Sequence, residues 1–78
     1  MNWKQHIHSD PTILLGKPVI KGTRISVELI LELYKNGWSK EVILSSYPSL
    51  VADDLTAVFE YLGECIRHEL YFPIQKVA

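Results

Sequence analysis

Apolar residues recur with helical spacing through the second half of the chain. The first such run places Val27, Ile30, Leu31 and Tyr34 at i, i+3, i+4 and i+7, the spacing of an amphipathic helix. Ser26 stands just before this run as an N-cap, and Asn36-Gly37 follows it as a C-terminal signal. The pattern therefore predicts a first helix that starts at Val27, after its cap Ser26, and ends at Asn36-Gly37.

Two further helices follow at once. Ser39 is a suitable cap for a short second helix, which must end early because Pro48 disfavours helical backbone at Tyr47. A longer third helix is predicted from Leu50 to about Leu70, with an apolar stripe of Leu55, Val58, Phe59, Leu62 and Ile66. The YPSL turn between the second and third helices suits a helix-turn-helix arrangement.

The N-terminal part has a different pattern. Residues 5–9 (QHIHS) and 18–21 (PVIK) are short β-type segments, and the turn signals of DPTILLGK separate them. The chain is therefore predicted to be mainly α: a single domain, 1–78, with a three-helix helix-turn-helix core. The β-hairpin or arm takes residues 1–25, the core 26–70 and the tail 71–78.

The composition predicts that the chain binds a second copy of itself or another partner. Hydrophobic residues make up 47 % of the 78 residues, which is more apolar surface than a small monomer easily hides. A homodimer or a bound partner is therefore expected. The single cysteine, Cys65, fits a reducing compartment, and the sequence has neither a signal-peptide pattern nor an apolar run near 18 residues. These features predict a cytoplasmic protein that does not span a membrane.

Charge is distributed unevenly along the chain. Residues 1–25 carry four basic residues against one acidic residue, net +3, whereas residues 51–78 carry five acidic against two basic residues, net −3. Any polyanion should therefore meet the N-terminal part. The candidate DNA-binding residues are Lys17, Lys21, Arg24 and, at the start of the second helix, Lys40.

The stretch GKPVIKGTRISVE, residues 16–28, is not a phosphate-binding P-loop. Its glycines are six residues apart, Thr23-Arg24 replaces Lys-Ser/Thr, and Pro18 lacks an N–H that such a loop would use. It is better explained as the turn that launches the first helix, with Gly22 supplying an unusual backbone angle and Thr23 bonding locally. This explanation gives no role to Lys17, Lys21 and Arg24. Their charges are open to contact with phosphate, with an acidic partner or only with water.

No residue pattern predicts catalysis, a metal or a cofactor. His6 and His8 alternate on a possible strand, but two ligands do not make a zinc site. Asp53 and Asp54 are explained by the first turn of the third helix, where carboxylates complement the helix dipole. Cys65 is expected to be a small core or interface residue, because only one cation is near it in sequence to lower its pKa. We therefore expect no enzymatic activity.

The tail contains much apolar material for a chain terminus. Its side chains are expected either to fold back over the core or, as the excess of apolar residues favours, to bind a partner. The predicted partner-binding residues are Tyr71, Phe72, Ile74 and Val77.

With these residues laid out, the chain resembles a family of small bacterial and archaeal proteins, domain of unknown function 433, over about residues 6–63. The matching residues are Asp10-Pro11, Gly16-Lys17-Pro18-Val19-Ile20, Gly22-Thr23-Arg24-Ile25, Val27, Gly37, Ile43, Tyr47-Pro48, Leu50, Asp54-Leu55, Ala57 and Tyr61. The resemblance implies a homeodomain-like or winged-helix-like helix-turn-helix core preceded by a short β element. It also implies a role as antitoxin to a PIN-like nuclease toxin encoded nearby. Val51 departs from the family, whose members tend to carry Thr or Ser there as the cap of the third helix, so Asp54 or Ser49 must compensate.

Three functions remain open at this point. The first is an antitoxin that silences the nuclease and regulates its own operon through operator DNA. The alternatives are a stand-alone helix-turn-helix repressor and a structural adaptor without DNA binding. DNA binding through the third helix is electrostatically unfavourable, because that helix carries Asp53, Asp54, Glu60 and Glu64.

Overall fold

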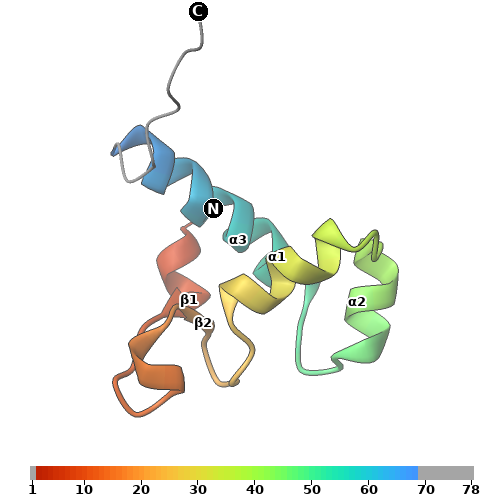
Figure 1. The fold of residues 1–78 in the computed structure, drawn as a ribbon, viewed down its shortest axis with the longest axis horizontal. Helices are drawn as coiled ribbons and strands as arrows, with labels where there is room; N and C mark the ends of the chain where they lie inside the picture. Colours follow the sequence, from red (N-terminus) through yellow and green to blue (C-terminus); the bar gives the residue numbers. More distant parts are fainter. Residues whose placement is uncertain (1, 69–78) are drawn as a thin grey trace, which may run out of the picture.

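The computed structural model describes residues 2–68. Along the chain the elements are the 3-10 helix η1 (Trp3–Gln5), β1 (Ile7–His8), the 3-10 helix η2 (Leu14–Gly16), β2 (Val19–Ile20), α1 (Val27–Lys35), α2 (Lys40–Ser46) and α3 (Ala52–Arg67) (Figure 1). The prediction of a mainly helical fold, with three helices after a short β-hairpin, is confirmed. The predicted partner-binding residues Tyr71, Phe72, Ile74 and Val77 lie outside the described residues.

The hairpin is antiparallel, with Ile7 opposite Ile20. After β2 the chain turns at Gly22, whose φ of +79° suits glycine. The Thr23 hydroxyl donates to the Ile20 carbonyl at 2.8 Å and accepts the N–H of Ile25 at 2.9 Å. The interpretation of this stretch as a helix-launching turn is therefore confirmed.

The ends of α1 are fixed by local hydrogen bonds. The Ser26 hydroxyl accepts the Leu29 N–H at 2.9 Å, which is the predicted N-cap. At the other end Gly37 has a φ of +87°, and the N–H of Trp38 reaches back to the Leu33 carbonyl at 3.0 Å. This is a Schellman ending, so the predicted helix stop at Asn36-Gly37 is confirmed.

The start of α3 depends on Asp54. Val51 occupies the N-cap position and has no side-chain acceptor, and Asp54 Oδ2 accepts the Val51 N–H at 2.9 Å instead. The other carboxylate oxygen lies 2.8 Å from His6 Nδ1, and Asp54 is only 7 % exposed. The predicted compensation at this cap is therefore supplied by Asp54, which also ties the N-terminal arm (residues 2–8) to α3. Asp53 beside it is exposed.

The core lies between the hairpin and the three helices. Its buried side chains are Ile7, Ile20, Val27, Ile30, Leu33, Ile43, Leu50, Leu55, Ala57 and Val58. The stripe predicted for α3 is buried at Leu55 and Val58, but Phe59 and Ile66 are 52 % and 62 % exposed. The two exposed residues lie at the edge of the stripe, where the core no longer covers α3.

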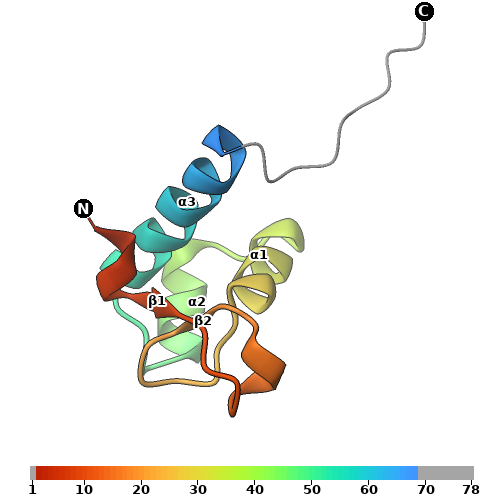
Figure 2. The ribbon, with the colours of Figure 1, turned by 90° about the vertical axis from the view of Figure 1, so that its left-hand side faces the viewer.

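The N-terminal arm runs along one side of α3. Trp3 contacts the part of α3 around Tyr61, and His6 contacts Asp54, so the arm runs antiparallel to the helix. Both ribbon views show the red N-terminal segment beside α3 (Figures 1 and 2). This arrangement creates the cavity described next.

Candidate partner-binding site

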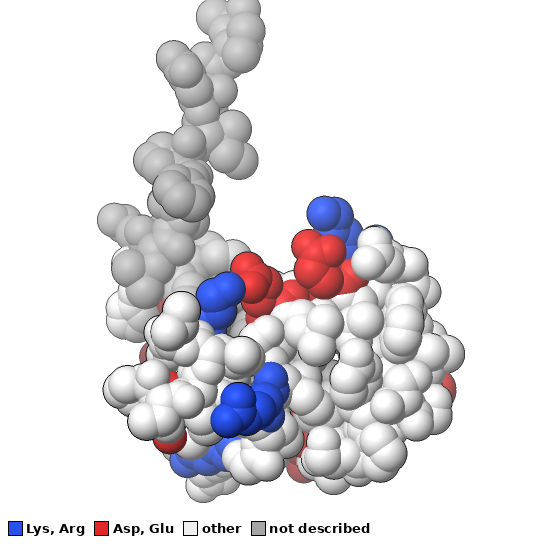
Figure 3. All heavy atoms as spheres, turned by 60° about the horizontal axis from the view of Figure 1, so that its bottom comes forward, with Lys and Arg blue, Asp and Glu red and all other residues white. Residues whose placement is uncertain are grey.

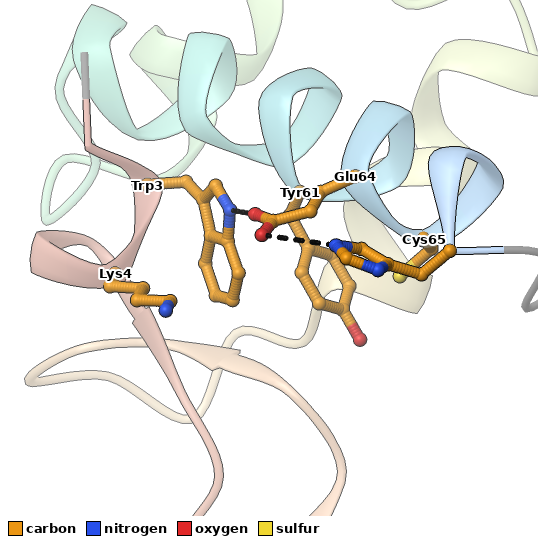
Figure 4. A pocket seen from close by; sticks show the side chains of 6 residues that line it. Trp3, Lys4, Tyr61, Glu64 and Cys65 are labelled. Carbon is orange, nitrogen blue, oxygen red and sulfur yellow. Dashed lines mark hydrogen bonds and ion pairs between the residues drawn. The ribbon is translucent and has the colours of Figure 1, made fainter.

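A cavity of about 320 Å³ lies between η1 and the C-terminal half of α3. Glu64 and Cys65 follow Tyr61 by three and four positions, and His68 follows them by four and three, so that the four residues share one face of α3. The opposite wall comes from η1, whose start is fixed by the Asn2 side chain accepting the Lys4 N–H at 3.0 Å. The lining residues are Trp3, Lys4, Tyr61, Glu64, Cys65 and His68 (Figure 4).

Two aromatic rings and a carboxylate dominate this cavity. The Trp3 and Tyr61 rings meet edge to face, with centroids 4.9 Å apart and planes inclined by 65°. The indole Nε1–H of Trp3 donates a hydrogen bond to the Glu64 carboxylate (Figure 4). Lys4 Nζ lies 5.8 Å from the Trp3 ring centroid, within cation–π range.

The electrostatics keep a negative charge in the cavity. The hydrogen bond from Trp3 lowers the pKa of Glu64, and nearby Lys4, His68 and Arg67 lower it further. Burial raises the pKa of Tyr61, and Cys65 adds to this shift, so the phenol is neutral at physiological pH. Aromatic faces next to an ionised carboxylate suit a cation, such as a guanidinium or ammonium group.

The predicted basic residues do not form one cluster. Lys17 Nζ is 3.1 Å from Glu28 Oε1, so its charge is partly compensated. Lys21 and Arg24 are exposed on the connection between β2 and α1, whereas Lys40 begins α2. The nine residues of α1, about 14 Å of helix, separate Lys40 from the other two. On the face drawn in Figure 3, basic side chains lie in separate small groups, and acidic side chains lie between the two upper groups.

Neither His6 nor His8 belongs to a group of possible metal ligands within residues 2–68. His6 is bonded to Asp54, and the buried Nε2 of His8 has no hydrogen-bond partner within residues 2–68. In the same part of the chain, no three His, Cys, Asp or Glu side chains are grouped to hold a metal ion. Cys65 is half-buried in the wall of the cavity.

The stretch of sequence that forms the hairpin, the turn at Gly22-Thr23-Arg24 and most of the three helices matches a known family. The family model described as Protein of unknown function (DUF433) matches residues 7–62. The chain belongs to the DUF433 family. A similar solved structure is a DUF433 member protein from Anabaena variabilis ATCC 29413, 29 % identical, with a TM-score of 0.72. The match covers 80 % of this chain but only 61 % of that one. None of the curated proteins matches the sequence.

In this DUF433 protein, α3 is poorly suited to the major groove. The N-terminal arm occupies one side of the helix, at Asp54, Tyr61 and Glu64. Asp53 and Glu60 are exposed, and such carboxylates repel phosphate. None of the helices in residues 2–68 has the length and apolar character that a membrane span requires.

Sequence reasoning missed the cavity of this DUF433 protein. Its two walls are 61 residues apart at Trp3 and Glu64, so no local pattern joins them. One signal was present: Tyr61, Glu64, Cys65 and His68 share a face of α3 that differs from the apolar stripe. Their spacing indicates a second contact face on that helix.

Replacing Trp3 by phenylalanine should raise the pKa of Glu64 towards its ordinary value of 4.5. An aromatic ring is kept, but the Nε1–H donor, whose hydrogen bond is the largest cause of the lowered pKa, is lost. A lowered pKa in the folded state stabilises the protein above the pKa of unfolded Glu64, and this contribution is lost as pH falls through the folded pKa. Trp3→Phe should therefore lose less stability on acidification than the wild type.

Carboxyl-carbon NMR titration of Glu64 measures this effect directly. Trp38→Phe, which changes the other tryptophan, is the matched control and should leave the titration of Glu64 unchanged. An equal shift in both variants, or none in Trp3→Phe, would contradict the assigned hydrogen bond.

Proposed function

We propose that this DUF433 protein is an antitoxin-like cytoplasmic protein that binds and neutralises a PIN-like nuclease toxin encoded nearby. The role is implied by the family resemblance. The observation that favours a protein partner over DNA is the cavity of Trp3, Tyr61 and Glu64 on the side of α3. No catalytic step is assigned to this chain.

The cavity matches the chemistry of a nuclease surface. A nuclease holds its polyanionic substrate with lysine and arginine side chains. One such cation, placed against the aromatic faces of Trp3 and Tyr61, would meet the ionised Glu64 carboxylate. The antitoxin would thereby occupy a group that the toxin needs for nucleic acid. The predicted apolar contacts of the tail follow His68 closely in sequence and would extend the same interface.

Operator binding is the second part of the proposal. Lys21 and Arg24 are exposed beside the start of α1, and no carboxylate within residues 2–68 lies in ion-pair range of either. They are the groups expected to contact phosphate, with α3 held away from the groove. A stand-alone repressor would instead act through DNA contacts alone. A structural adaptor would bind neither DNA nor a nuclease.

Co-expression with the adjacent open reading frame tests the antitoxin role. The neighbour alone should arrest growth, and the wild-type chain should restore growth and co-purify with it. A harmless neighbour, or one that never co-purifies, would contradict the role itself. In that case, salt-titrated DNA binding distinguishes a repressor from an adaptor.

A charge-only substitution tests the cavity. Glu64→Gln keeps an oxygen for the Trp3 N–H but removes the negative charge, and should weaken toxin binding about tenfold. Glu41→Gln, an exposed residue on α2, makes the same chemical change away from the cavity and should have no effect. Growth rescue with unchanged affinity in Glu64→Gln would refute the cavity as the toxin site while leaving the antitoxin role intact.

A further inference from the structure

One face of α3 is covered neither by the core nor by the N-terminal arm. Helical geometry places Gly63 at the centre of this outer face, opposite the buried Asp54. Ile66, 62 % exposed, lies towards its core edge, and the charged pair Glu60 and Arg67 lies on its other edge. The outer face is defined here as Thr56, Phe59, Glu60, Gly63, Ile66 and Arg67.

A hollow marks the centre of this face. Because Gly63 has no side chain, a space of about 320 Å³ opens there between Phe59 and Arg67. A β-carbon added at Gly63 would approach only the Arg67 side chain, at 3.5 Å, so the site has room for an incoming group. Phe59 is held at the edge of the hollow by the Tyr34 ring, 5.3 Å away between centroids.

We propose that the outer face of α3 binds the outer face of a second copy of this chain, with the two helices antiparallel. Thr56, Phe59, Gly63 and Ile66 follow each other at intervals of three, four and three residues, the spacing of a helix–helix seam. Large exposed apolar side chains at that spacing are costly to leave in water.

The charges select a second copy and fix its direction. In a two-fold pair of antiparallel helices, Glu60 of one copy lies opposite Arg67 of the other, and the reverse, which gives two equivalent ion pairs. A parallel two-fold pair would place Glu60 and Arg67 of the two copies on opposite edges of the contact, where neither ion pair can form. The surface is therefore complementary to itself in one direction only.

The same register also matches the shapes of the two faces. When Glu60 is level with the other copy's Arg67, Ile66 is level with position 61 of the other copy, between Phe59 and Gly63, so that each isoleucine packs into one end of the hollow of the other helix. The exposed ion pairs contribute little affinity but form only in the antiparallel orientation, and the apolar contact supplies most of the binding. The cavity of Trp3 and Tyr61, on a different side of α3, stays open in such a dimer.

Sedimentation equilibrium of the full chain tests the dimer. The wild type should dimerise, and Ile66→Glu should weaken dimerisation by more than about tenfold, because a charge would enter the partner's hollow. Far-UV circular dichroism checks that the variant folds; Ile66 is exposed, so the helix content should be kept. A wild-type monomer at every concentration would overturn the proposal.

Charge reversal tests the register, and does so without the risk of misfolding at an apolar position. Glu60→Arg and Arg67→Glu should each weaken the homodimer about tenfold, whereas the double variant should restore it. An equimolar mixture of the two single variants should form heterodimers, because the arginine introduced at position 60 faces the glutamate introduced at position 67, while Arg67 of the first variant faces Glu60 of the second. Glu32→Arg on α1 is the control for a general charge effect. Failure of both the double variant and the mixture to recover would overturn the antiparallel register.

Discussion

Replacing Asp54 by alanine should lower the free energy of unfolding by about 2–3 kcal/mol. One carboxylate oxygen caps α3 through the Val51 N–H, and loss of such a cap typically costs about 1 kcal/mol. The other oxygen is bonded to His6, whose ring would be left without this partner in a half-buried site, at a similar cost. Urea denaturation followed by circular dichroism measures the change.

Asp53→Ala is the matched control for this prediction. Asp53 stands in the same first turn but is exposed, so its loss removes only a helix-dipole interaction of about 0.3–1 kcal/mol. Asp54→Asn should be intermediate, since an amide oxygen can still accept the Val51 N–H but the charge is gone. Equal effects of Asp53→Ala and Asp54→Ala would mean that the helix dipole alone explains both residues.

The local structure of this chain could be predicted because its signals are local. Ser26, Ser39 and Gly37 mark helix ends through hydrogen bonds that reach only three to five residues along the chain. The turn at Gly22 and Thr23 likewise depends on neighbouring backbone groups. These residues therefore revealed α1, α2 and the turn after the hairpin without any knowledge of the tertiary structure.

The candidate sites depend on contacts that leave no periodic signal. His6 and Asp54 are 48 residues apart, and Trp3 and Glu64 are 61 apart, so the arm's position along α3 could not be inferred from spacing. The exposure of Ile66 was missed for a related reason. A stripe of apolar residues predicts a contact, but it does not distinguish the core of one chain from the surface of another chain.

The arm changes how the helix-turn-helix pattern should be interpreted. In DNA-binding proteins of this type the second helix of the motif presents base-reading side chains to the major groove. Here the arm occupies one side of α3, and the outer face carries Phe59, Glu60 and Ile66. The three-helix arrangement is retained, but the exposed side chains of α3 are acidic and apolar over much of its surface, and fold alone does not determine function.

Replacing Ile20 by alanine should destabilise the protein by about 2–5 kcal/mol, the usual cost of truncating a fully buried isoleucine. Ile20 is 2 % exposed and lies opposite Ile7 in the hairpin, so it joins the arm to the helical core. A domain of this size has a total stability of about 4–12 kcal/mol, so the loss is a large share of it. Leu15→Ala removes the same number of carbons from a residue that is 95 % exposed, and should change stability by less than about 0.5 kcal/mol.

The comparison of these two variants decides whether the arm folds as one unit with the helices. Cooperative unfolding, with the midpoint lowered equally for hairpin and helix signals, is expected if Ile20 belongs to the single core. If Ile20→Ala costs no more than Leu15→Ala, the hairpin opens independently of the helices. Trp3 would then leave α3 whenever the hairpin opened, and the cavity beside Glu64 would exist only part of the time. Both the proposed toxin site and the hydrogen bond that lowers the pKa of Glu64 therefore require that Ile20 hold the arm in place.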